Sequence, residues 1–99
     1  MYGTVARMQL KPGAESQLQA QMQEFETLQV PGFVSSTVYR MDNAPNELCL
    51  AVVFESKETY FANANSPEQD ARYRKMRELF TSDPEWHDGE VIYHQSAST

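Results

Sequence analysis

The sequence predicts an α+β fold in which one antiparallel sheet of four strands carries helices on one face. Three observations predict it. Four segments have the alternating or β-branched character of strands, the segments between them have apolar residues at helical spacing, and turn residues separate them in the order β-α-β-β-α-β. That order is the split βαβ, or ferredoxin-like, arrangement.

The first strand and the first helix are indicated by the spacing of their apolar residues. Alternate residues of segment 2–10 ("YGTVARMQL") share one face, which is typical of a strand, and the "KPG" that follows breaks it. Segment 14–27 is then predicted to be an amphipathic helix, because its apolar residues form one stripe between Gln and Glu residues. The stripe consists of Ala14, Leu18, Met22 and Phe25.

A hairpin is predicted next. Residues 33–41 ("FVSSTVYRM") are rich in β-branched and aromatic side chains, as strands are. The cluster "DNAPN" at 42–46 is typical of a turn, and 47–55 ("ELCLAVVFE") predicts the third strand. Two strands joined by about five turn residues form an antiparallel hairpin.

Helix-capping residues mark the second helical region. Ser56 is expected to cap a short helix that ends at about residue 64. The "SPEQ" at 66–69 offers an N-cap serine, a proline at the first helical position and a glutamine at the third. It is expected to open a helix that runs to about Phe80.

The stretch "DPEWHDGEV", residues 83–91, contains the single tryptophan and one of two histidines. It is predicted to form a corner, with its "DP" starting a short turn and its "DG" reversing the chain into a last strand at 89–95. Trp86 is expected to be an apolar plug at that corner. The tail 96–99 is expected to fray.

Both faces of the third strand are apolar, although helices can cover only one face of the sheet. One face would present Leu48, Leu50, Val52 and Phe54, and the other Cys49, Ala51 and Val53. We therefore expect a second copy of the chain to cover the open face, since homodimers are the commonest oligomers.

Length and composition limit the function classes. Ninety-nine residues predict a single domain, 1–99, with its core in 2–95. The net charge of −6 disfavours nucleic acid as a partner. No apolar run approaches the roughly 20 residues that a membrane span needs, and the N-terminus has no signal-peptide pattern. A cytoplasmic protein without a membrane partner is therefore expected.

Four segments give the chain a resemblance to a known family: "LKPG" at the end of the first strand, "PGF" at 31–33, "FESKETYFANANSPE" at 54–68 and "EWHDGE" at 85–90. Over roughly 2–94 the sequence resembles the antibiotic biosynthesis monooxygenase family. The resemblance implies a dimeric α+β barrel. It also implies oxygenases that act on polycyclic aromatic phenols or quinols with no metal or flavin, so no cofactor is expected.

The resemblance implies a cavity between sheet and helices. Its expected catalytic residues are Asn63, which would hydrogen-bond a substrate oxygen, and Tyr73, which would do the same or pass a proton. The expected substrate-binding residues are Tyr60, Met76, Trp86 and His87. Structural alternatives stay open: aromatic and Met side chains at helical spacing are often core, Asn63 could face solvent, and His87 could be an ordinary turn residue.

Haem and metal chemistry are disfavoured. Haem-degrading relatives of this fold have Asn, Trp and His at the positions occupied here by Ala6, Asn63 and Tyr73, so the axial histidine is missing. His87 and His94 are seven residues apart, and an odd separation places them on opposite faces of an extended segment. The resemblance thus implies a cofactor-independent monooxygenase for a small aromatic or quinol-type substrate. The alternative is a non-catalytic ligand-binding or regulatory barrel.

Overall fold

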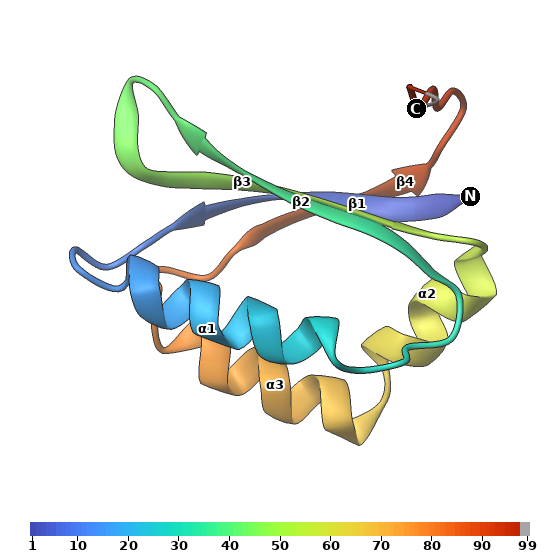
Figure 1. Ribbon diagram of the computed structural model, residues 1–99, viewed down its shortest axis with the longest axis horizontal. Helices are drawn as coiled ribbons and strands as arrows, with labels where there is room; N and C mark the ends of the chain where they lie inside the picture. The colour runs from blue at the N-terminus through green and yellow to red at the C-terminus, as the bar shows by residue number, and fades with distance from the viewer. Residues whose placement is uncertain (98–99) are drawn as a thin grey trace.

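Four antiparallel strands form one sheet, and three helices cover one of its faces (Figure 1). The structure, a computed structural model, describes residues 1–97. The sheet order is β2-β3-β1-β4, which confirms the predicted ferredoxin-like fold. In chain order the elements are β1 (Tyr2–Gln9), α1 (Glu15–Glu26), β2 (Phe33–Met41), β3 (Ala44–Phe54), α2 (Lys57–Ala64), α3 (Pro67–Arg77) and β4 (Glu85–Glu90).

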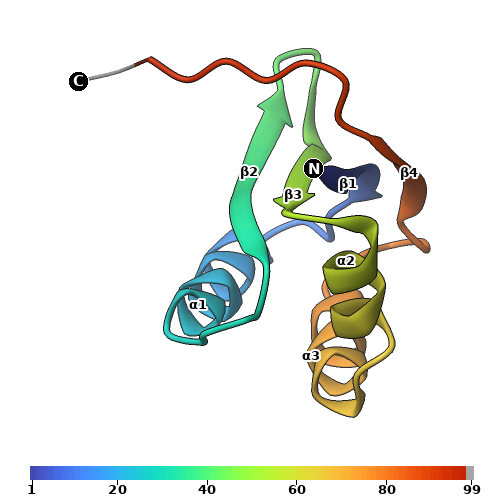
Figure 2. The ribbon, with the colours of Figure 1, turned by 90° about the vertical axis from the view of Figure 1, so that its right-hand side faces the viewer.

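The strand register decides which side chains meet the helices. Ala6 of β1 is opposite Leu50 of β3 and Trp86 of β4, so these three share the face that the helices cover. Val5 is opposite Ala51 and His87, and these share the other face. In Figure 2 all three helices lie below the sheet, and no helix lies above it.

The core lies between β1, β3 and the helices. Its buried members are Ala6, Met8, Leu10, Ala14, Leu18, Leu48, Leu50, Leu79 and Phe80. The segment after α3 is tied to the end of β1 by backbone hydrogen bonds from Lys11 N to Leu79 O (2.8 Å) and from Thr81 N to Gln9 O (2.8 Å). These bonds close the end of the helical layer that lies beside the β1–α1 turn.

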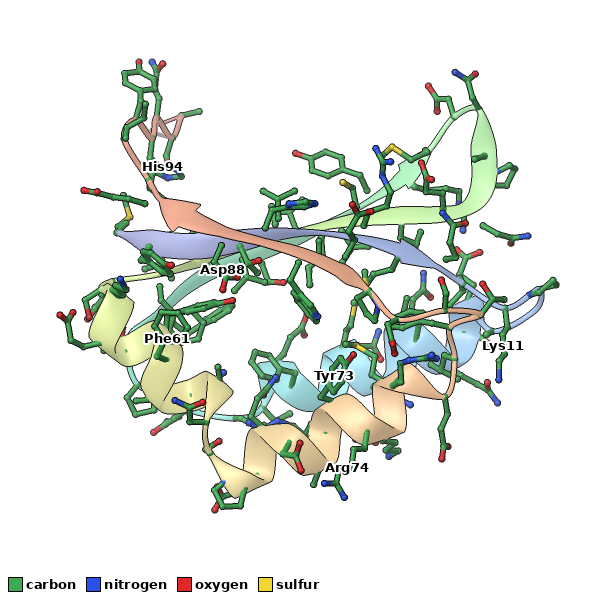
Figure 3. The ribbon with its side chains drawn as sticks, turned by 180° about the vertical axis from the view of Figure 1, so that it is seen from behind. Lys11, Phe61, Tyr73, Arg74, Asp88 and His94 are labelled. Carbon is green, nitrogen blue, oxygen red and sulfur yellow. The ribbon has the colours of Figure 1, made fainter. Side chains whose placement is uncertain are left out.

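Serine caps start two of the helices, as predicted. The Ser56 hydroxyl accepts a hydrogen bond from the backbone N–H of Thr59 (3.1 Å), and the Thr59 hydroxyl accepts one from the Ser56 N–H (3.2 Å). The Ser66 hydroxyl accepts one from the Gln69 N–H (3.1 Å). Figure 3 shows Tyr73 of α3 pointing toward the sheet, whereas Arg74 points away from it.

The turn between β2 and β3 is shorter than the predicted 42–46. β3 begins at Ala44, which pairs with Met41, so only Asp42 and Asn43 are left in the turn. Strand pairing therefore continues through "APN", although Pro and Asn are poor strand formers. The β2–β3 ladder is irregular near both ends, between Phe33 and Ser35 and between Arg40 and Met41.

The predicted corner at 83–91 was wrong. Asp83 and Pro84 start no helical turn, and β4 begins at Glu85, four residues before the predicted strand. The "DG" at 88–89 lies within β4, paired with Thr4 and Gly3 of β1. Pairing with β1 thus imposes an extended backbone on a sequence with weak strand character of its own.

The chain after β4 has no regular secondary structure over residues 91–97 and lies on the side of the sheet opposite the helices (Figure 1). The predicted strand at 89–95 therefore ends at Glu90. Of the tail 96–99 that was expected to fray, residues 98–99 lie outside the described part of the chain. Within residues 1–97, no helix is long and apolar enough to cross a membrane.

Candidate active site

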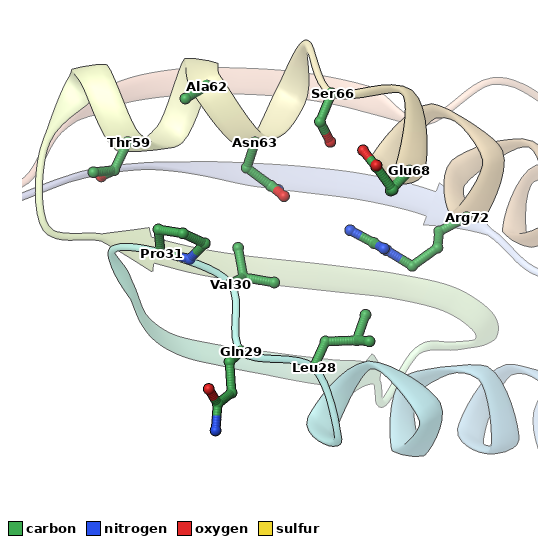
Figure 4. Close-up of a pocket in the computed structure, with 10 residues that line it drawn as sticks. All are labelled: Leu28, Gln29, Val30, Pro31, Thr59, Ala62, Asn63, Ser66, Glu68 and Arg72. Atoms are coloured by element: carbon green, nitrogen blue, oxygen red, sulfur yellow. The ribbon is translucent and has the colours of Figure 1, made fainter.

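An open cleft of about 390 Å³ lies on the helix side of the molecule, between α2 and α3 on one flank and the segment that joins α1 to β2 on the other (Figure 4). Its apolar walls come from Leu28, Val30, Pro31 and Ala62. Its polar side chains come from Gln29, Thr59, Asn63, Ser66, Glu68 and Arg72. The mixture of apolar walls and a few polar groups is typical of a site for a small molecule.

Gly32 fixes one wall of the cleft. Its φ of +79° is a backbone conformation that favours glycine. A Cβ atom at this position would lie only 2.4 Å from Cβ of Thr59, so the loop packs directly on α2. The Gly32 carbonyl also accepts a hydrogen bond from the Glu55 N–H (2.7 Å). The loop and the start of α2 are therefore held at a fixed separation.

Arg72 extends from α3 into the cleft (Figure 4). Its Nε and Nη2 donate to Oε1 of Gln69 at 3.2 and 3.0 Å. Its guanidinium carbon lies 5.5 Å from the centroid of the Phe25 ring, a cation–π contact. Asn63 lines the same cleft from α2. The cleft thus contains an amide and a positive charge.

Tyr60 lies on another face of α2. Its hydroxyl donates a hydrogen bond to Oδ1 of Asp88 (2.8 Å), and its ring contacts Tyr2, Phe54 and Phe61 with centroids 5.0–5.7 Å apart. Burial, followed by the hydrogen bond to the Asp88 carboxylate, raises the pKa of Tyr60 to about 12. Tyr60 therefore keeps its proton at neutral pH.

Thr4 is the strand partner of Asp88, and its buried hydroxyl lies on the helix-covered face of β1 beside the Tyr60 hydroxyl. The Tyr60 hydroxyl donates to Asp88, and the interaction with Thr4 acts on the pKa of Tyr60 in the opposite direction, lowering it.

Tyr73 and Trp86 form a second aromatic pair, between α3 and β4, with ring centroids 6.0 Å apart. Met76, one turn further along α3, packs against the main core. The Trp86 side chain is 42% exposed and covers Tyr73 rather than a corner. These three residues lie on the sheet side of α3 and do not line the cleft.

His87 is on the open face of the sheet, paired with Val5. Its Nε2 lies 3.6 Å from Oε1 of Glu85, and both side chains are 64% exposed. The sheet separates His87 from the cleft. No cluster of three or more His, Cys, Asp and Glu side chains suited to a metal ion occurs within residues 1–97.

The predicted site residues therefore fall into separate places. Asn63 lines the cleft, Tyr73, Met76 and Trp86 lie beneath the sheet, Tyr60 bonds Asp88, and His87 is on the far face. Sequence reasoning did not single out Arg72, because it lies in a basic run late in a helix, where charge usually meets solvent. The spacing of Phe25 and Arg72 in the sequence gives no signal of their contact.

The geometry defines a ferredoxin-like α+β protein with an open, ligand-sized cleft on its helix side. Residues 1–75 match the family model described as antibiotic biosynthesis monooxygenase. The match spans well over half of the chain, and the chain belongs to this family. A comparison with curated proteins finds no sequence match to the chain.

Solved structures with the same fold include SnoaB, a cofactor-independent oxygenase from Streptomyces nogalater, in an asparagine-to-alanine mutant form. It is 18% identical over 94% of each chain, with a TM-score of 0.77. A Chloroflexus aurantiacus protein that carries the family's name is 24% identical over 96% of each chain, with a TM-score of 0.76. Rv0793 from Mycobacterium tuberculosis is 22% identical, covering 96% of this chain and 98% of its own, with a TM-score of 0.75. At these identities the likeness shows the fold alone.

Proposed function

We propose that this protein is a cofactor-independent monooxygenase that acts on a small aromatic or quinol-type substrate held in the cleft. The observation that carries the proposal is the cleft itself, which combines apolar walls with the Asn63 amide in a member of the antibiotic biosynthesis monooxygenase family. The description of the structurally similar S. nogalater protein as a cofactor-independent oxygenase supports it.

The chemistry takes its electrons from the substrate. An electron-rich aromatic that has lost a proton reduces dioxygen; one oxygen atom bonds to the ring, and the other leaves as water with two hydrogens from the substrate. An anthrone, for example, gains one oxygen atom, loses two hydrogens and becomes a quinone. The protein would orient the substrate, exclude bulk water and receive the proton.

Asn63 is the proposed orienting group, because its amide lines the cleft and can hydrogen-bond a substrate carbonyl or hydroxyl. Tyr73 points toward the sheet (Figure 3) and does not line the cleft. It can pass a proton only to a substrate that reaches beneath the sheet. Tyr60, Met76 and Trp86 would contact the same inward part of the substrate.

Oxygen consumption tests this function. Anthrone and a series of hydroquinones would be incubated with the wild type, Asn63→Ala, Tyr73→Phe and Asn65→Ala; the last variant changes a neighbouring asparagine that does not line the cleft. We expect Asn63→Ala to lower the rate at least tenfold, since it removes an orienting hydrogen bond, and Asn65→Ala to match the wild type. No consumption above the rate without enzyme would leave the alternative, a non-catalytic ligand-binding or regulatory protein.

We also infer that a second copy of the chain covers the open face of the sheet. Val5 and Tyr39 are 50% and 57% exposed there, Cys49 and Ala51 lie between them, and Val53 follows Ala51 along the same face, all three with only partial burial. Arg7 and His87 flank these apolar residues. Exposed apolar residues that gather on one face often mark an interface, and a second copy can present the same residues across a two-fold axis.

Light scattering after size-exclusion chromatography would test the homodimer. The wild type is expected to have the mass of a dimer at micromolar concentration. Val5→Lys, which places a charge in the centre of the apolar face, is expected to give a monomer. Gln23→Lys, on the exposed side of α1, is the matched control and should stay dimeric. A monomeric wild type would refute this inference.

A further inference from the structure

We propose that the cleft selects aromatic ligands that carry an anionic oxygen, a carboxylate or an ionised hydroxyl, and that Arg72 is the residue that recognises the charge. This inference rests on the proposed function and deepens it, because it names the chemical class of the substrate for the same cleft. Its basis is the position, support and charge environment of one guanidinium.

Arg72 is held in place before any ligand arrives. Gln69 accepts two of its hydrogen bonds through a single oxygen, and the Phe25 ring lies against the guanidinium at 5.5 Å. Arginine has five N–H donors, so the end of the fork that carries Nη1 is left for a ligand. A donor that is already oriented loses less entropy when it binds an anion.

Arg72 forms no ion pair in the described part of the chain, although the Glu68 carboxylate lies in the same cleft. Within residues 1–97, the other three basic residues of α3 each have an acidic partner: Arg74 with Asp70 (3.0 Å), Lys75 with Glu24 (3.6 Å) and Arg77 with Asp83 (2.6 Å). Arg72 has no carboxylate oxygen within 4.0 Å in that part of the chain. It is the basic residue of the helix that lines the cleft.

The surroundings of Arg72 favour a flat, apolar ligand body with one charged end. Leu28 and Val30 face Arg72 across the cleft, and Pro31 and Ala62 extend the apolar surface (Figure 4). An aromatic ring can lie against these side chains while its anionic oxygen meets the guanidinium. A hydrogen bond between the guanidinium and an anionic oxygen is charge-assisted, which makes it stronger than one between neutral groups.

Glu68 places a negative charge in the same cleft and should affect anion binding in the opposite direction to Arg72. Its carboxylate also lines the cleft and would repel an anionic ligand. The N-terminal end of α3, which begins at Pro67, offsets part of this repulsion through the helix dipole. Removal of the Arg72 charge should therefore weaken the binding of an anion, and removal of the Glu68 charge should strengthen it.

Titration calorimetry with two probes of the same shape tests the inference. Naphthalene-2-carboxylate carries the charge, and naphthalene-2-carboxamide is its neutral counterpart. The wild type should bind the carboxylate about tenfold more tightly or better, as a charge-assisted hydrogen bond predicts. Arg72→Gln should abolish this preference, and Glu68→Gln should increase it about twofold to threefold.

Two further variants keep the test decisive. Arg74→Gln removes a positive charge from the outer side of the same helix and should leave the preference unchanged. Arg72→Lys keeps the charge without the planar fork, and should retain a reduced preference even if Arg72→Gln is too unstable to titrate. Equal binding of the two probes by the wild type, or an unchanged preference in the folded Arg72 variants, would overturn the inference.

The outcome is separable from that of the proposed function. A preference for the carboxylate that depends on Arg72, with no oxygen consumption by any substrate, would contradict the monooxygenase and support the anion site. Oxygen consumption that is equal for charged and neutral substrates and unaffected by Arg72→Gln would contradict the anion site and support the monooxygenase.

Discussion

The two faces of the sheet are made by the same strands but differ in how far their side chains are buried. On β1, Ala6 and Met8 face the helices and are buried, while Val5, which precedes Ala6, faces the other way and is half exposed. On β3, Leu50 is buried whereas Val53 is only partly covered. The helices therefore bury the apolar side chains of only one of the two faces of the sheet. The helix-covered face stabilises the fold, and the open face is the one through which we propose that two copies associate.

The largest expected effect is a difference in stability between truncating a side chain on the helix-covered face of β1 and truncating one on its open face. Met8→Ala should lower the free energy of unfolding by about 2–5 kcal/mol, because the side chain is 1% exposed in the core. Val5→Ala should lower it by only about 0.5 kcal/mol at concentrations where the chain is monomeric. Urea unfolding followed by circular dichroism measures both.

Protein concentration sharpens this comparison. If two copies meet through the open face, the cost of Val5→Ala should grow with concentration, because association stabilises the folded state by mass action. The loss of stability caused by Met8→Ala should increase less with protein concentration. Equal costs for the two variants at every concentration would contradict the division into a structural and an assembly face.

The next effect concerns the packing of the cleft wall. Gly32→Ala should destabilise the protein by about 2–4 kcal/mol, because its φ is +79° and the new Cβ would meet Thr59. Gly13→Ala is the matched control: φ is +81°, but nothing lies within 4 Å of the added atom. It should cost only about 1–2 kcal/mol. The difference between the two melting temperatures measures the contact between loop and helix.

Trp86 should matter less than a buried tryptophan. Replacing a buried tryptophan with alanine costs about 3–5 kcal/mol, but this ring is 42% exposed at the edge of the helix-covered face. We expect Trp86→Ala to cost about 1–2 kcal/mol through its lost contact with Tyr73. A cost as large as that of Met8→Ala in the same unfolding experiment would contradict the description of Trp86 as a half-exposed edge residue.

The smallest effect at neutral pH is expected from Tyr60→Phe, which removes the hydrogen bond to Asp88 at a cost of about 0.5–1 kcal/mol. Its pH dependence is more informative. The pKa of Tyr60 is about 12 in the folded protein against 10.0 as its ordinary value. Because the pKa is raised, the contribution of Tyr60 to the stability of the folded protein is complete below pH 10 and is lost as the pH rises from 10 to 12.

Urea unfolding at pH 7 and at pH 11 tests this. The wild type should lose more stability between the two values than Tyr60→Phe does, since the variant has no proton to release at this position. Tyr73→Phe removes a tyrosine whose hydroxyl has no hydrogen bond to a side chain within the described residues, and should behave like the wild type. An identical pH dependence in wild type and Tyr60→Phe would show that folding does not raise the pKa of Tyr60.

Local sequence patterns predicted most of the fold. The exceptions are segments whose structure depends on pairing with another strand. The apolar stripe of α1 and the capping serines Ser56 and Ser66 report directly on local backbone geometry. β4 does not, because "EWHDGE" has few strand-forming residues and is extended only by its pairing with β1. The two-residue turn at 42–43 likewise depends on how far β2 and β3 pair.

The candidate site was less predictable, because its geometry depends on which faces meet. Asn63 was identified from the family resemblance and does line the cleft. His87 was included because a histidine can accept a substrate proton. Residue type gives no sign of which face a strand presents, and a shift of one residue reverses that face. Arg72 was not singled out because its place in the cleft depends on its contact with Phe25 and on a loop that is distant in the sequence.

The edges of the sheet have a consequence for solubility. An edge strand offers unpaired backbone groups on which another chain can extend the sheet into a filament. Here β4 is only six residues long and carries exposed carboxylates at Glu85, Asp88 and Glu90. β2, at the other edge, has irregular pairing near both of its ends, and such bulges disrupt the template for a further strand. Growth in the plane of the sheet is thus discouraged at both edges.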